Sequence, residues 1–158
     1  MKRLEETFAI DAGAHQFYIQ DDGDVGNFGE IWTQQVVNDR LGVLSRGVAI
    51  RALRADVVPV KVELYTNEPE EELSGWDHVA EASLEIITGH VAVVGCFDGL
   101  VGAPRIALTS GTYAVRIFSG GLDTLNGNGI DGDDHYRVVL WPDGYRPPRV
   151  LKRWVRPR

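Results

Sequence analysis

Residues 58–65 read Val58-Pro59-Val60-Lys61-Val62-Glu63-Leu64-Tyr65, and they decide the fold class. Apolar residues alternate here with Lys61, Glu63 and Tyr65, which is the two-residue period of a β-strand. Such alternation is typical of a sheet that buries one face and leaves the other in water. Pro59 lacks an N–H, so we expect this strand to begin at an edge or to pair on one side only at that point.

Asn-Gly and Asp-Gly pairs separate similar runs along the chain. They begin at Asp22, Asp98, Asn126, Asn128, Asp131 and Asp143. These dipeptides reach the positive φ values of tight hairpin turns at little cost. The alternating runs lie at residues 7–10, 14–20, 47–52, 58–65, 76–87, 91–97, 105–109, 113–119, 136–141 and 149–155. The sequence therefore predicts an all-β fold, a two-sheet antiparallel β-sandwich of about nine or ten strands.

One short helix is expected near residues 33–41. Thr33 is a suitable N-cap for it, and Gly42 is a suitable residue just after its end. A strand is nearly as good an interpretation of Val36-Val37. Helix also competes for residues 76–87, because alanine and glutamate are good helix formers. We favour a strand there, because apolar and charged residues alternate along the segment and would therefore lie on opposite faces of a strand.

The length of 158 residues predicts one domain, with a basic C-terminal tail from about residue 146. Cys96 is the only cysteine of the sequence, which excludes an internal disulfide and favours a reducing compartment. The first six residues lack the apolar stretch of a secretory signal, and no run is long enough to span a bilayer. We expect a cytoplasmic protein that does not bind membranes.

The net charge of −7 is unevenly placed. Residues 146–158 contain six arginines and lysines and no acid, so the remaining chain carries −13. An acidic body repels nucleic acid and attracts basic partners. Ordinary solubility charge is the simpler alternative.

The loop at residues 123–134 contains several oxygen ligands of the kind that calcium prefers. Its weak candidate metal ligands are Asp123, Asn126, Asn128, Asp131 and Asp133. The loop fails the EF-hand pattern, since Ile130 and Arg137 stand where ligands are needed. A long hairpin loop whose side chains cap its own turns is therefore the favoured interpretation.

Catalytic motifs are absent from the sequence. The histidines, His15, His78, His90 and His135, do not form a metal-binding spacing, and no cofactor is expected. There is no nucleophile elbow and no phosphate loop. A glycosidase-type pair of carboxylates stays open, because spacing along the sequence does not give a separation in space. His78 lies on the same face of its expected strand as the apolar residues. This position favours the interpretation of His78 as a hydrogen-bonded residue in the core or at its rim.

Several motifs together suggest a family resemblance. They are Gly75-Trp76-Asp77-His78-Val79, the segment 111–116 that opens on Gly111-Thr112-Tyr113, and the segments 121–123 and 131–138. They resemble a group of uncharacterised bacterial proteins. The broader layout, with His15-Gln16-Phe17 in an early strand, Trp32-Thr33 after it and Tyr136 near the end, is similar to the competence protein J family. The resemblance spans about residues 7–140 and does not include the arginine-rich end.

That family inhibits a DNA-entry nuclease, so the resemblance implies a non-catalytic sandwich. We expect an acidic inhibitor that occludes a basic protein such as a nuclease and binds no nucleic acid. The candidate partner-binding residues are Asp21, Asp22, Asp24, Glu68, Glu70, Glu71, Glu72, Asp131, Asp133 and Asp134. The alternative is a sandwich that binds a metal or small ligand at the 123–134 loop. A homodimer through edge strands, and an enzyme that uses His78 or His135 with carboxylates, also stay open.

Overall fold

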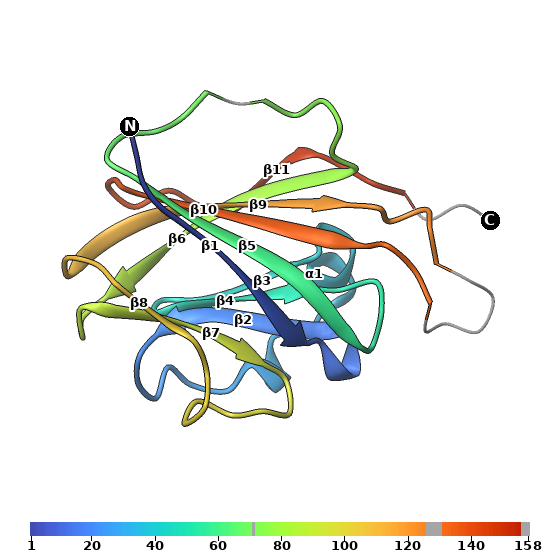
Figure 1. Ribbon diagram of the computed structural model, residues 1–158, viewed down its shortest axis with the longest axis horizontal. Coiled ribbons are helices and arrows are strands. Elements are labelled where there is room, and N and C mark those ends of the chain that lie inside the picture. Colours follow the sequence, from blue (N-terminus) through green and yellow to red (C-terminus); the bar gives the residue numbers. More distant parts are fainter. Residues whose placement is uncertain (71, 126–130, 156–158) are drawn as a thin grey trace.

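The computed structural model describes residues 1–70, 72–125 and 131–155 (Figure 1). Two β-sheets pack face to face in these ranges, which confirms the predicted all-β sandwich. The described chain forms 11 strands, one more than the upper end of the predicted range. Helix is confined to α1 (Gln34–Asp39) and two short 3₁₀ turns, η1 (Gly13–His15) and η2 (Phe28–Glu30).

The larger sheet has six strands and is mixed. Its order is β1 (Lys2–Asp11), β5 (Val57–Tyr65), β10 (His135–Pro142), β9 (Gly111–Gly120), β6 (His78–Ile86) and β11 (Arg149–Lys152). The expected antiparallel arrangement holds except between β10 and β5, which run parallel. The antiparallel pairing of β10 with β9 fixes its direction, and its other side then meets β5. That pairing begins at Val60, so Pro59 pairs with β1 only.

The smaller sheet has five strands and is antiparallel. Its order is β3 (Leu41–Leu44), β4 (Gly47–Arg51), β2 (Gln16–Asp21), β7 (His90–Gly95) and β8 (Arg105–Ala107). Strand β3 was not predicted, because its four residues directly after a helix are too few to show a recognisable alternation of apolar and polar residues.

The predicted helix is confirmed, and the side chain of Thr33 caps it by accepting from the N–H of Val36 at 3.2 Å. Its predicted end is wrong. Arg40, with a φ of 59°, turns the chain out of the helix, and Gly42 instead pairs with Ala49 inside β3. A Cβ at Gly42 would stand 2.4 Å from the end of the Ile31 side chain, which would have to shift to make room for a larger residue.

The core lies between the two sheets and follows the predicted period of two. Val58, Val60 and Val62 are fully buried on the inner face of β5. Their neighbours in the core come from both sheets, for example Phe17 and Ile19 of β2. This burial is the main favourable contribution to folding.

The outer face of the larger sheet is covered, although the sequence predicts a wet face. Residues 66–70 and 72–77 cross over it on their way from β5 to β6 (Figure 1). Glu63 points outward as predicted, and so does Trp141, yet the two residues are only 2% and 1% exposed. A second, smaller apolar cluster forms there around Val79, Phe118 and Trp141. Among the described residues, no helix has the length and apolar character needed to cross a membrane.

Candidate functional site

The three predicted acidic segments do not form one face. Residues 21–24 include the last residue of β2 and the turn after it, at the left end of Figure 1, whereas residues 131–134 precede β10 at the right end. A strand of six residues such as β2 separates these ends by about 17 Å. Residues 68–72 belong to the segment over the outer face of the larger sheet, and Glu71 among them lies outside the described residues.

Asp21 is a structural carboxylate, because it is fully buried. It accepts hydrogen bonds from the hydroxyl and N–H of Thr88, from the N–H of Ile87 and from the guanidinium of Arg46 at 2.5 Å. Burial alone would raise the pKa of Asp21, but the hydrogen bonds from Thr88, Arg46 and Ile87 outweigh it and lower the pKa to about 2. Asp22 is also paired, with Nε of Arg105 at 2.9 Å, while Asp24 is exposed.

Replacing Asp21 with asparagine is expected to lower the free energy of unfolding by about 2 kcal/mol near neutral pH. The carboxylate has a lower pKa in the folded chain than the ordinary 3.8, so its contribution is present above pH 3.8 and is lost as the pH falls toward 2. Urea denaturation of both proteins measures the difference at each pH. A difference that does not shrink below pH 3.8 would contradict this role.

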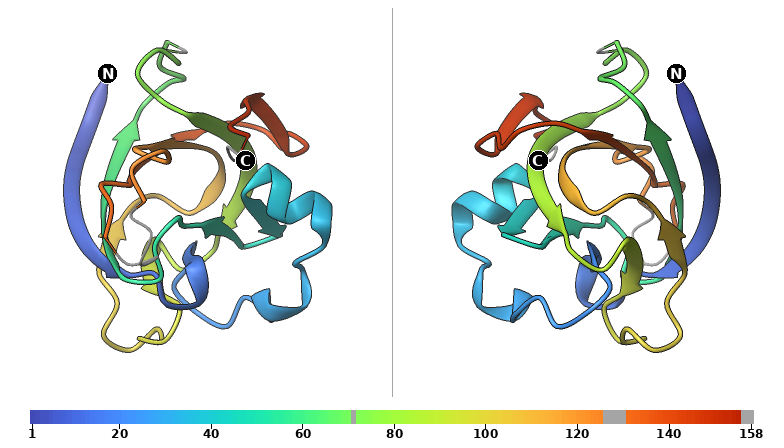
Figure 2. Two further views of the ribbon diagram at one scale, coloured as in Figure 1. Left: turned by 90° about the vertical axis from the view of Figure 1, so that its right-hand side faces the viewer. Right: turned by 90° about the vertical axis from the view of Figure 1, so that its left-hand side faces the viewer.

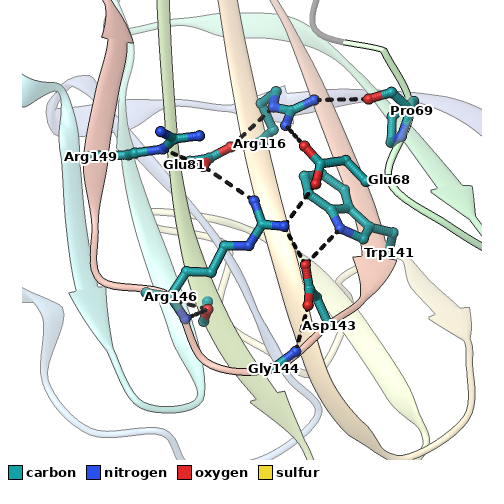
Figure 3. A network of polar contacts seen from close by, with 10 residues as sticks. Glu68, Pro69, Glu81, Arg116, Trp141, Asp143, Gly144, Arg146 and Arg149 are labelled. Atoms are coloured by element: carbon teal, nitrogen blue, oxygen red, sulfur yellow. Dashed lines mark hydrogen bonds and ion pairs between the residues drawn. The ribbon is translucent and has the colours of Figure 1, made fainter.

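Glu68 belongs to a charge network on the outer face of the larger sheet (Figure 3). It accepts from Nη2 of Arg116 and from Nη2 of Arg146, each at 2.7 Å. Hydrogen bonds from Arg146 and Arg116 lower the pKa of Glu68, although burial opposes them. Glu70 and Glu72 are exposed.

Glu81 is the buried anion of the same network and is only 1% exposed. It accepts from Nε of Arg116 at 3.1 Å and from Nε of Arg149 at 2.6 Å (Figure 3). The guanidinium carbon of Arg116 lies 4.6 Å from the centroid of the Trp141 ring. Arg149 opens β11, so the basic C-terminal segment is held to an acidic neighbour in the sheet.

Four loops that carry aspartates meet at the right end of the sandwich in Figure 1. The N–H of Cys96 donates to the carbonyl of Asp11 at 3.2 Å, and the N–H of Ala12 donates to the carbonyl of Asp56 at 2.9 Å. The N–H of Arg54 donates to the carboxylate of Asp134 at 3.3 Å. We call this region the aspartate end, after the carboxylates that it carries: Asp11, Asp56, Asp98, Asp131, Asp133 and Asp134.

Asp134 holds these loops together and is fully buried. It forms an ion pair with Nε of Arg54 and accepts from the hydroxyl of Tyr136 at 2.6 Å. That hydroxyl accepts in turn from the N–H of Leu53 at 2.8 Å. Burial, and the Asp134 carboxylate beside it, raise the pKa of Tyr136. Asp134 is therefore an anchor inside the fold rather than a surface group.

A pocket of about 580 Å³ opens at the aspartate end. Its lining contains three aspartates, Asp56, Asp131 and Asp133. The other lining residues are Arg54, Thr124, Leu125 and Gly132. These three aspartates are exposed. Asp131 and Asp133 were predicted from the sequence, but Asp56 was not, because a single aspartate between two strands carries no local signal.

The calcium interpretation of the 123–134 loop gains no support from the geometry. Within the described ranges, no three histidine, cysteine or acidic side chains converge so that they could hold a metal ion. Asp123 instead accepts from the indole N–H of Trp154 at 3.0 Å. The two other candidates of this loop, Asn126 and Asn128, lie outside the described residues.

His78 is a buried rim residue, as its parity predicted, and is 2% exposed. Its Nδ1 accepts from the N–H of Trp154 at 3.0 Å. Its Nε2 lies 2.7 Å from the carbonyl of Asp39 and must therefore carry the proton. Burial lowers the pKa of His78 to about 4, so the ring is neutral at physiological pH. His135 is exposed, and its Nδ1 lies 2.8 Å from the carbonyl of Asp133.

The fold and the site together define a β-sandwich with one mixed sheet, internal ion-pair networks and an acidic end. No protein-family model matches the chain, and neither does any curated protein sequence. Its structure is similar to that of ComJ from Bacillus subtilis, an inhibitor of the DNA degrading activity of NucA. The TM-score is 0.64 at 11% identity, over 90% of this chain and 98% of that one.

A second solved structure, named crocagin biosynthetic gene J, has a TM-score of 0.59 at 14% identity. That match covers 90% of this chain and all of the other. The resemblance to the competence protein J family that the motifs indicated is thus confirmed at the level of the fold.

Proposed function

We propose that this chain is a non-catalytic binding protein that occludes a basic protein partner, such as a nuclease, with its aspartate end. The similarity to ComJ supports an inhibitor-like role, because ComJ is an inhibitor of a nuclease. The charge pattern supports a basic partner, because the body of the chain is strongly acidic. The aspartate end is smaller than the ten-residue acidic face that was expected from the sequence.

The observation that carries the proposal is the concentration of exposed aspartates around the pocket of the aspartate end. Asp56, Asp131 and Asp133 line this pocket, and the one arginine that lines it, Arg54, is neutralised by the buried Asp134. The surface therefore presents a negative field. A concave acidic site suits a protruding lysine or arginine side chain of a partner.

Such an interface would work by mimicry of nucleic acid. Carboxylates would occupy the cationic groove of a nuclease in which phosphates otherwise bind. Charged groups of this kind act mainly on the association rate, and their effect weakens as salt screens them. Binding is therefore expected to be fastest at low ionic strength.

Replacing Asp56, Asp131 and Asp133 together with asparagine is expected to slow association with the partner at least about tenfold at low salt. The partner is first captured from a lysate of the source organism on the immobilised wild-type chain and identified by mass spectrometry. Surface plasmon resonance with the purified partner then gives the association rate, and a DNA-degradation assay tests inhibition when the partner is a nuclease.

The matched control changes the net charge equally at the other acidic segments. It carries Asp24→Asn, Glu70→Gln and Glu72→Gln, all at exposed positions. The proposal requires the control to associate like the wild type. Equal slowing by both variants would show a response to total charge alone, and a wild-type chain that retains no basic protein at low salt would remove the proposed partner class.

A further inference from the structure

Phe97 exposes an aromatic ring at the aspartate end. It lies in the loop that joins β7 to β8, residues 96–104, and it is 73% exposed. In Figure 1 this loop leaves β7 on the side of the molecule where β1 ends, and the N–H of Cys96 donates to the carbonyl of Asp11 at 3.2 Å. A large apolar side chain in water forgoes the free energy that its burial would supply. Aromatic side chains are enriched at protein interfaces, where a partner supplies that burial.

The ring of Phe97 rests on the backbone of Gly13. A Cβ built at Gly13 would stand 2.3 Å from Cδ2 of Phe97, so a side chain at that position would displace the ring. Gly13 opens the turn η1, in which Ala14 and His15 follow with φ values of 55° and 62°. The left view of Figure 2 faces this end of the molecule and shows η1, in blue, beside the yellow loop after β7. Two consecutive left-handed residues other than glycine cost free energy, and such backbone gathers at functional sites.

Hydrogen bonds fix η1 in this conformation. The ring Nδ1 of His15 donates to the carbonyl of Leu53 at 3.0 Å. The N–H of Gly13 donates to the carboxylate of Asp11 at 3.1 Å. The support under the ring of Phe97 is therefore in place before any partner binds, and a prearranged contact group loses little conformational entropy on binding.

The loop that carries Phe97 is held from its other end by Arg105. This guanidinium donates to the carbonyls of Leu100 and Ala103, each at 2.7 Å, and its Nε pairs with Asp22 at 2.9 Å. Leu100 and Ala103 join the small apolar cluster on the outer face of the smaller sheet. The same loop thus buries two of its apolar side chains against the sheet, whereas it turns Phe97 toward solvent.

The surroundings of Phe97 combine apolar and acidic side chains. Val57, which pairs with Asp11 in the larger sheet, is 49% exposed. Asp56 precedes Val57 and Asp98 follows Phe97, and both aspartates are exposed. An aromatic side chain with charged groups at its border is the arrangement of a protein interface, in which an apolar centre is enclosed by a polar rim.

We propose that Phe97 is the apolar anchor with which this chain holds its basic partner, and that the partner has an apolar socket bordered by lysines or arginines. This inference rests on the proposed function. Charge complementarity selects the occupant, because Asp11, Asp56 and Asp98 border the ring. A second copy of this acidic end would instead bring carboxylates against carboxylates. The charges then act on the encounter of the two proteins, and burial of the ring slows their separation.

Phe97→Ser is the decisive variant, measured by surface plasmon resonance with the purified basic protein that capture on the wild-type chain identifies. We expect its dissociation rate to rise at least about tenfold while its association rate stays within about twofold of the wild type. The rise should persist at high salt, because salt does not screen an apolar contact. Phe97→Leu keeps an apolar side chain and is expected to dissociate more slowly than Phe97→Ser. Circular dichroism melting shows that each variant is folded.

Tyr145→Ser is the matched control. Tyr145 is also an exposed aromatic residue, at 76%, but it lies between β10 and β11 at the left end of Figure 1, opposite the aspartate end. A folded Phe97→Ser chain that dissociates like the wild type, or an equal rise in both variants, would overturn the anchor. The proposed function would then still stand if the aspartate variant slows association. A wild-type chain that retains no basic protein would overturn both.

Discussion

Replacing Arg116 with methionine is expected to lower the free energy of unfolding by about 3 kcal/mol. Arg116 is fully buried and pairs with Glu81, which is 1% exposed. Its removal takes one donor from Glu68 in the covering segment and one from Glu81 beneath it, although Arg146 and Arg149 still contact Glu81. A buried carboxylate that loses its buried cationic partner is costly. Urea denaturation at neutral pH measures the loss.

The double variant Arg116→Met and Glu81→Leu distinguishes two contributions to the free energy of unfolding. One is the cost of leaving Glu81 without Arg116, and the other is the net contribution of the intact ion pair. We expect it to be more stable than Arg116→Met alone, because no buried carboxylate is then left without its partner. Arg149 is 55% exposed and can be hydrated once Glu81 is gone. Lys61→Met is the surface control, since its pair with Glu5 is exposed and is expected to contribute less than about 1 kcal/mol. A larger loss in the double variant would contradict this account.

The stability of the chain is expected to fall by about 3 kcal/mol between pH 6.5 and pH 4 because of His78. Burial lowers the pKa of His78 from 6.5 to about 4, so the unfolded chain binds a proton there before the folded chain does. Stability is then lost as the pH falls through this window. Protonation also removes the lone pair of Nδ1 that accepts from the N–H of Trp154. Denaturation midpoints in urea at several pH values follow the change.

His78→Gln tests the assignment, because glutamine does not titrate. We expect its stability to change much less than that of the wild type between pH 6.5 and pH 4. His135→Gln, at an exposed position, is expected to keep the wild-type slope. The carboxylates Asp21 and Glu63 have pKa values lowered from 3.8 and 4.5 to about 2, so the loss from Asp21 falls mainly below this window and the loss from Glu63 begins at its lower end. A wild-type slope in His78→Gln would contradict the role of His78.

The strands could be predicted because period-two alternation is a local property. Val58, Val60 and Val62 face one way in any pairing of β5, so the inner face follows without knowledge of its neighbours. The pairing itself is not local. Nothing near Val60 indicates that its parallel partner is Tyr136, since that pairing depends on how the whole sheet is assembled. The covered outer face was missed for the same reason, because a distant segment covers it.

The acidic face was predicted from formal charges, and formal charges do not show which acids are paired. Asp21 pairs with Arg46, and Glu68 pairs with Arg146, across long separations in sequence. An aspartate in a loop looks the same in sequence whether it anchors a turn or faces water. Asp134 is the clearest case, since it stands beside the exposed Asp133 and is itself fully buried.

The parallel contact between β5 and β10 has a consequence for how the chain folds. Strand β10 occupies the middle of the larger sheet, yet it follows nine of the other described strands along the chain. The earlier strands β1 and β5 can pair sooner, but they must wait for β10 to connect them to β9 and β6. Folds with such distant pairings pay loop-closure entropy first and fold slowly. Assembly of this sandwich should therefore include a cooperative step that requires the chain up to and including β10, and nascent chains that stop before residue 135 should be protease-sensitive.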